Sequence, residues 1–141
     1  MSFTPEHHVD VADALRHATY DGAIWSLNCE QMNINLIRLS SGATILAHIN
    51  NDLDVLIVVF EGAGELQIDD TTHVLGPGIA LVVPRGTRRA IRCIRGPLAY
   101  LTAHRQRGGL MPTGSAYAVS NGTCLIGGRN MPLYLLRCRL L

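Results

Sequence analysis

Histidine and arginine side chains capable of chemistry are concentrated in a stretch of short apolar segments. His48 and Asn50 share one face of an extended segment with Leu46, and the residues between them fall on the opposite face. Further along, Arg89 belongs to a cluster of five arginines within residues 85–95. An imidazole binds metals or exchanges protons near neutral pH, and a guanidinium pairs with carboxylates or phosphates. Residues 42–93 therefore place one histidine and one arginine where a small barrel would open.

Short strands must position these side chains. Residues 55–60 (VLIVVF) are apolar throughout and rich in β-branched types, so we expect a strand that is covered on both faces. Turn-forming residues follow at 61–64, 69–71, 76–78 and 84–86, which leaves strands at 65–68, 73–75, 79–83 and 88–94. Turns spaced about 8–12 residues apart are typical of an antiparallel sandwich or barrel.

Two spaced motifs in this stretch resemble those of the cupin superfamily. Residues 42–50 (GATILAHIN) are similar to the first cupin motif, with Asn50 in place of its second histidine. Residues 78–89 (GIALVVPRGTRR) are similar to the second motif, with Arg89 in place of its histidine. The glycines of residues 61–64 fit a hairpin between the motifs. The resemblance implies an all-β fold, a small antiparallel jelly-roll barrel of the RmlC-like kind, but no single reaction, because cupin barrels host unrelated activities.

The resemblance implies an incomplete metal site. Cupins that bind a metal use two histidines and a carboxylate from the first motif and a histidine from the second. Here His48 is retained, Asn50 is a poor transition-metal ligand, and Arg89 has no lone pair to offer. Counting forward from Asn50 gives Asp54 at the carboxylate position, whereas counting back from residue 62 gives Val55 on the other face. The candidate ligands of a divalent transition metal are therefore His48 and Asp54, fewer than the three that such sites usually need.

The arginine in the second motif suggests a different chemistry. A guanidinium directed into an apolar cavity is costly unless an anion pairs with it. Its partner would be an internal carboxylate, Asp52 or Asp54, or the carboxylate or phosphate of a small-molecule ligand. A solvated arginine at the barrel mouth is the remaining alternative. The candidate ligand-binding residues are Arg89, His48 and Asn50, joined by Tyr100 and His104 from a later strand.

That later strand follows Pro97. Residues 98–103 (LAYLTA) alternate so that Tyr100, Thr102 and His104 share a face. On the inner face His104 would join His48 at the site, whereas on the outer face it would end the strand in solvent. His73, on the short return strand, is expected to be exposed.

Composition sets the outer limits. A chain of 141 residues with 48% hydrophobic and 16% charged residues indicates a single globular domain, 1–141, with a core barrel at about 23–104 and a C-terminal arm at 105–141. No apolar run approaches the ~20 residues of a membrane span. The first residues do not resemble a secretory signal, so we expect a cytoplasmic protein without a membrane partner. Four scattered cysteines without CxxC spacing predict reduced thiols.

Charge is unevenly distributed. All 11 acidic residues lie at or before Asp70, and ten of the 12 basic residues, all arginine, lie after it. No nucleic-acid motif accompanies the arginines and only 5% of residues are aromatic, so a nucleic-acid partner is not expected. Pairing across neighbouring strands, or within a homodimer, would neutralise these charges.

The flanking segments complete the prediction. Residues 5–16 predict one short amphipathic helix, and residues 23–27 and 34–39 predict strands that cover the barrel. Three functions stay open: a barrel that binds a small anion without a strong metal, a metal-dependent oxygenase or isomerase acting on a small carbonyl or acid, and a non-catalytic oligomerising module. The apolar chain end, residues 133–141, is expected to dock on the barrel or on a partner subunit.

Overall fold

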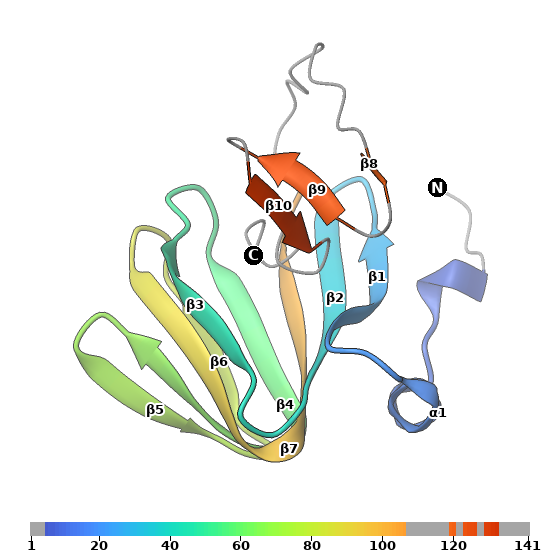
Figure 1. The fold of residues 1–141 in the computed structure, drawn as a ribbon, viewed down its shortest axis with the longest axis horizontal. Coiled ribbons are helices and arrows are strands. Elements are labelled where there is room, and N and C mark those ends of the chain that lie inside the picture. Colours follow the sequence, from blue (N-terminus) through green and yellow to red (C-terminus); the bar gives the residue numbers. More distant parts are fainter. Residues whose placement is uncertain (1–4, 107–118, 121–122, 127–128, 133–141) are drawn as a thin grey trace.

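Antiparallel strands carry the chain from residue 22 to residue 105 in the computed structural model, which describes residues 5–106, 119–120, 123–126 and 129–132 (Figure 1). All pairings between them are antiparallel, which confirms the predicted all-β class. The strands are β1 (Gly22–Asn28), β2 (Met32–Leu39), β3 (Thr44–Ile49), β4 (Val55–Ile68), β5 (Thr71–Leu75), β6 (Ala80–Val83) and β7 (Arg88–Arg105).

Two long strands, β4 and β7, build the barrel because each contributes to two layers. Residues 55–59 of β4 pair with β6 and with the second half of β7, which in turn pairs with β2. Residues 64–68 of β4 pair with β5 and with the first half of β7, which in turn pairs with β3. We call the layer β1–β2–β7–β4–β6 the larger layer and the layer β3–β7–β4–β5 the smaller layer.

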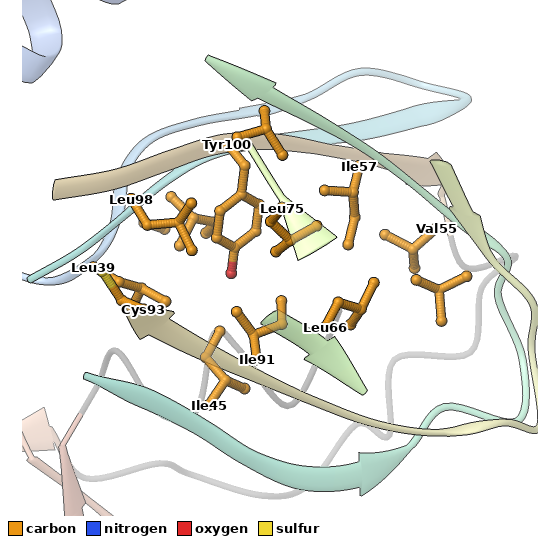
Figure 2. Close-up of a cluster of buried hydrophobic side chains, with 14 residues drawn as sticks. Leu39, Ile45, Val55, Ile57, Leu66, Leu75, Ile91, Cys93, Leu98 and Tyr100 are labelled. Carbon is orange, nitrogen blue, oxygen red and sulfur yellow. The ribbon is translucent and has the colours of Figure 1, made fainter. Parts of the chain in front are cut away.

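The hydrophobic core fills the space between the layers. Its members alternate along each strand with outward residues, as expected for strands buried on one face. Figure 2 shows Leu98, Tyr100 and Ile57 of the larger layer opposite Ile45 and Ile91 of the smaller layer. The Tyr100 hydroxyl is directed into this cluster rather than out of the barrel.

The predicted burial of residues 55–60 on both faces is only half right. Val55, Ile57 and Val59 are almost fully buried in the core, but Leu56 and Phe60 on the other face are exposed. The prediction that this strand is covered on both faces is therefore wrong for the described chain, and its outer face is apolar and accessible.

The predicted breaks at residues 61–64 and at Pro97 are also wrong. β4 continues through residues 61–64 by a series of register shifts, and Gly62 takes a positive φ of 82° there. Gly62 also lies so close to the backbone of Pro97 and Leu98 that a Cβ would overlap them. The hairpin that joins β4 to β5 instead turns at residues 69–70, where Asp69 has a φ of 48°. β7 likewise runs through Pro97 as one strand.

The N-terminal segment divides where one helix was expected. Pro5–His7 form a 3-10 turn, and α1 spans Val11–His17. Asp10 causes the restart, because its extended backbone and its side chain, which accepts a hydrogen bond from the Asp13 N–H at 2.9 Å, cap α1. Neither helix has the length and apolar character needed to cross a lipid bilayer.

The C-terminal arm contains short strands that the sequence pattern did not predict. They are β8 (Val119–Ser120), β9 (Thr123–Ile126) and β10 (Arg129–Pro132), paired in a separate sheet. The remaining predictions for the arm, including the docking of residues 133–141, lie outside the described residues. Cys29 is partly buried and Cys93 is buried, and both are free thiols as expected.

Candidate functional site

A bulge in β3 places the retained histidine inside the barrel. Ile45 pairs with Ile91 and His48 pairs with Arg89, so two residues of β3 oppose one residue of β7 between them. The extra residue turns His48 to the same side as Ile45. The prediction that Leu46 and His48 share a face is therefore wrong, since Leu46 is 73% exposed.

The two motif residues contact each other directly. The Arg89 Nε–H donates to His48 Nε2 at 3.3 Å. A guanidinium only donates, so Nε2 must be the accepting nitrogen of a neutral imidazole. The other ring nitrogen, Nδ1, lies 2.9 Å from the Leu46 carbonyl oxygen, to which it donates. Both nitrogens of His48 are therefore engaged, and the lone pair that would bind a metal is directed at Arg89.

The rest of the Arg89 guanidinium is buried without a partner among the described residues. Arg89 is only 5% exposed. Its Nη1 and Nη2 atoms are buried and meet no hydrogen-bond acceptor among the described residues. Burial lowers the pKa of Arg89 from its ordinary value, and the charge interaction with Tyr100 acts in the opposite direction. An arginine stays protonated despite such a shift, so the site holds a positive charge.

A small cavity of about 20 Å³ lies beside this charge. That volume accommodates roughly one water-sized group. Arg89, His48, Tyr100 and Thr102 supply its polar groups, and the Thr102 hydroxyl is buried without a partner in the described chain. The remaining lining residues are Ile45, Val55, Ile57, Ala90 and Ile91.

Thr102 was not among the predicted ligand-binding residues. Its alternation with Tyr100 along β7 was the signal that could have identified it, because both side chains share the inner face.

Asn50 is buried but does not line the cavity. Its side-chain oxygen accepts hydrogen bonds from the backbone N–H groups of Asp52 at 3.0 Å and Leu53 at 3.2 Å. The backbone carbonyl oxygen of Asn50 accepts a hydrogen bond from the Gly86 N–H at 2.7 Å. Asn50 therefore ties the loop after β3 to the turn before β7, which supports the site from outside.

Asp54 also lies outside the cavity, and Val55 takes the inward position. The exposed Asp54 carboxylate accepts a hydrogen bond from the Arg85 backbone N–H at 2.8 Å. No bulge restores the register that would have turned it inward. The described ion pairs join Arg89 to neither Asp52 nor Asp54, so the expected internal partner is not found among the described residues.

His104 shares a face with Tyr100 and Thr102, as the alternation predicted, and this face is the inner one. It pairs with Asn33 at the end of β2 and lies outside the cavity lining. Its Nδ1 atom lies 2.9 Å from the Arg105 carbonyl oxygen. His73 is exposed as expected.

The donor set does not fit a transition metal. In the described part of the chain, no three His, Cys, Asp or Glu side chains gather as ligands. Of the two predicted ligands, His48 is engaged by Arg89 and Asp54 lies outside the cavity. The group that replaces the second-motif histidine is a cation, which repels a metal ion.

The arginines next to Arg89 on β7 face outward. Arg88 and Arg92 are exposed, and Arg92 pairs with Glu65 of β4 at 3.3 Å. This ion pair joins the basic second half of the chain to its acidic first half across neighbouring strands.

Comparison of the sequence with known protein families identifies one match. Residues 35–104 match the model of the cupin domain family, a region that contains both His48 and Arg89. No protein of curated description matches the chain in sequence.

Several solved structures share the fold. The chain is similar to BH2720 from Bacillus halodurans, with 20% identity and a TM-score of 0.61 over 75% of this chain and 86% of that one. It is similar to TT1209 from Thermus thermophilus, with 20% identity and a TM-score of 0.60 over 72% and 98%. It is also similar to an RmlC-like cupin family protein with a double-stranded β-helix fold from Methanocaldococcus jannaschii, with 25% identity and a TM-score of 0.51 over 56% and 73%.

At these identities the structural likeness supports the fold and leaves activity open. Together with the matched domain and the jelly-roll arrangement of β1–β7, it assigns this chain to the cupin superfamily.

Proposed function

We propose that this cupin barrel binds a small organic carboxylate, which takes the place of the metal as the charged group at its centre. The observation that carries the proposal is the pair of buried donors Nη1 and Nη2 of Arg89, which meet no acceptor in the described chain. An unpaired buried charge is strongly unfavourable. A bound anion would remove that cost.

Carboxylate is the anion whose geometry best matches the Arg89 guanidinium. Its two oxygens match the two outer nitrogens of a guanidinium in a planar, bidentate pair. The Thr102 hydroxyl can donate to the same group, because it has no partner among the described residues. A tetrahedral phosphate is bulkier, and the cavity of about 20 Å³ disfavours it.

The lining also indicates the rest of the ligand. Ile45, Val55 and Ile57 surround the charged end with apolar surface, so a short apolar or unsubstituted carbon attached to the carboxylate fits them. The cavity accepts little beyond the charged end. A longer ligand would have to extend past His48, which is only partly buried.

The geometry of the site also limits any catalytic role of His48. His48 Nε2 accepts from Arg89, so His48 serves as a general base only after this hydrogen bond opens. The alternative of a metal-dependent oxygenase or isomerase needs at least three ligands, and the described side chains do not supply them.

Thermal unfolding in a panel of anions tests the proposal. Sodium formate, acetate, propionate and phosphate are compared with sodium chloride at equal ionic strength, on wild type, Arg89→Met and Arg88→Met. A ligand at ten times its Kd stabilises the folded state by about 1.4 kcal/mol. We expect the monocarboxylates to raise the Tm of wild type and Arg88→Met but not of Arg89→Met.

Two results would overturn the proposal. One is a carboxylate effect equal in all three proteins, which would make it a general salt effect. The other is stoichiometric manganese, iron, nickel or zinc in protein purified without a histidine tag, if the metal disappears in His48→Ala.

A further inference from the structure

The inner face of β2 changes from apolar to polar along the strand. Ile37 on this face belongs to the hydrophobic core. Asn35 and Asn33, which precede it on the same face, carry amides instead, whereas the outward residues Ile34 and Leu36 are apolar. A strand that only closes a core has the reverse pattern, with its apolar residues inside. The inverted pattern therefore indicates that the barrel uses polar groups at this end of β2.

Neighbouring strands continue the polar surface on both sides of β2. The register places one residue of β1 and one residue of β7 beside each asparagine. The two rows are Ser26, Asn35 and Thr102, and Asn28, Asn33 and His104. We call this set of residues the polar wall. Hydrogen bonds join its members, because the Ser26 hydroxyl donates to Asn35 Oδ1 at 2.7 Å and Asn35 Nδ2 donates to Asn33 Oδ1 at 2.9 Å.

Burial deepens along the polar wall toward the Arg89 cavity. Asn28 is exposed and Asn33 is half-buried. Asn35 is 9% exposed, and Thr102 is only 2% exposed. Thr102 also lines the cavity together with Arg89. The polar wall therefore leads from solvent at the mouth of the barrel to the buried guanidinium.

The other half of the larger layer is apolar at the same depth. Thr102 pairs on its other side with Ile57 of β4, which in turn pairs with Leu81 of β6. Val55 lies on the same face of β4 and pairs with Val83. The mouth therefore has a polar side, on β1, β2 and β7, and an apolar side, on β4 and β6. A ligand that has both kinds of surface fits such a mouth in one orientation.

Asn35 keeps hydrogen-bonding capacity that the described chain does not use. A side-chain amide offers two N–H donors and two acceptor positions on its oxygen. Among the described residues, Asn35 uses one of each, with Asn33 and Ser26. The Thr102 hydroxyl beside it is buried and has no partner there. Buried polar groups are normally paired, so a ligand group that both donates and accepts would complete these residues. A hydroxyl group does both.

We propose that the polar wall binds hydroxyl groups of the ligand, which is then a hydroxylated carboxylic acid. This inference rests on the proposed binding of the carboxylate by Arg89. Apolar side chains surround the charged end, so the carbon next to the carboxylate is unsubstituted. Directly paired residues such as Asn35 and Thr102 stand about 5 Å apart at Cβ. The hydroxyl groups therefore belong on the third and fourth carbons, beyond the cavity and beside Asn35.

Titrations of the full-length protein, followed by ¹H–¹⁵N NMR, test the inference. The ligands are sodium butyrate, 2-hydroxybutyrate and 3,4-dihydroxybutyrate, which share one carbon chain. In wild type we expect 3,4-dihydroxybutyrate to bind about tenfold more tightly than butyrate, which is the gain from two modest hydrogen bonds. We expect 2-hydroxybutyrate to bind no more tightly than butyrate, because its hydroxyl would meet the apolar lining of the cavity.

Replacement of single amides by leucine locates the effect. In Asn35→Leu we expect the ratio of the butyrate Kd to the 3,4-dihydroxybutyrate Kd to fall from about ten to about one. Asn33→Leu alters a less buried part of the polar wall and should lower the ratio to about three. Gln67→Leu is the matched control, because Gln67 carries an exposed amide on the smaller layer, and it should keep the wild-type ratio. Circular dichroism establishes that each variant is folded.

Each failure has its own signature. A wild type that binds butyrate and 3,4-dihydroxybutyrate equally, with both lost in Arg89→Met, would contradict the role of the polar wall and leave the carboxylate site standing. A wild type that binds none of the acids would contradict the carboxylate site, and this inference with it. A ratio of about ten that persists in folded Asn35→Leu and Asn33→Leu would place the hydroxyl groups elsewhere.

Discussion

Arg89 and His48 lie opposite each other in the register of β7 and β3, and the guanidinium donates to the ring nitrogen that a metal would need. In this arrangement the Nε2 lone pair of His48 is directed at Arg89 and is not available to a metal. A donor-only cation replaces one ligand and engages another. Arg89 keeps a positive charge beside a small cavity, and its Nη1 and Nη2 atoms donate to no residue in the described part of the chain.

Replacing Arg89 with methionine should stabilise the protein in buffer without carboxylates. Methionine keeps much of the apolar volume and removes the cost of an unpaired buried charge, so we expect the free energy of unfolding to rise by about 1–3 kcal/mol. Urea unfolding measures it. Arg88→Met, at an exposed neighbouring position, should change it by less than about 0.5 kcal/mol. A loss of stability in Arg89→Met would mean that the guanidinium already has a favourable partner.

His48 should stabilise the folded protein by accepting a hydrogen bond from Arg89. His48→Ala leaves the Arg89 Nε–H without its partner, so we expect a loss of about 1–3 kcal/mol in unfolding free energy. His48→Gln retains an acceptor on a side chain of similar reach and should recover at least half of the loss. Equal losses in the two variants would show that packing, and not the hydrogen bond to Arg89, accounts for the effect.

Asn50 should affect stability but not the response to carboxylates. Its side chain accepts from two backbone amides, so Asn50→Ala should cost about 1–2 kcal/mol. Because Asn50 does not line the cavity, the rise in Tm with acetate should stay at its wild-type value. Asn51→Ala, at the exposed neighbouring position, should leave both quantities unchanged. An acetate effect lost in Asn50→Ala would return Asn50 to the ligand-binding residues.

Gly62 and Gly86 separate close packing from backbone conformation. Both have a positive φ, of 82° and 79°, so alanine at either position is strained by about 1 kcal/mol. A Cβ at Gly62 would also overlap the backbone of Pro97 and Leu98, whereas a Cβ at Gly86 meets nothing within 4 Å. We expect Gly62→Ala to cost about 2–4 kcal/mol and Gly86→Ala about 1 kcal/mol in urea unfolding. Similar costs would argue against the close approach of β4 to β7 at this position.

The fold was predictable from the sequence because turn chemistry and motif spacing are local. The turns near residues 69–71, 76–78 and 84–86 lie where their residue types indicated. The long strands were missed for a physical reason. Gly62 is read locally as a break, but a positive φ and close packing against β7 let the strand continue through it.

The site was only partly predictable, because bulges are not visible in an alternating pattern. The shift between Ile45 and His48 reversed the assumed faces of β3. Asn50 and Asp54 were assigned to the site by counting positions along the motif. Their side-chain oxygens instead accept hydrogen bonds from backbone N–H groups of nearby loops. Arg89 and Tyr100 do line the cavity, because period 2 holds locally along β7.

The most direct test of the central claim observes the Arg89 side chain while a carboxylate is added. In a ¹H–¹⁵N spectrum, the Nε–H signal of Arg89 is assigned as the arginine signal absent from Arg89→Met. The account predicts that sodium acetate shifts this signal saturably, relative to sodium chloride at equal ionic strength, while the signal absent from Arg88→Met stays in place. An Arg89 signal that does not move in folded protein, or that moves no more than that of Arg88, would contradict the claim that this arginine binds an anion.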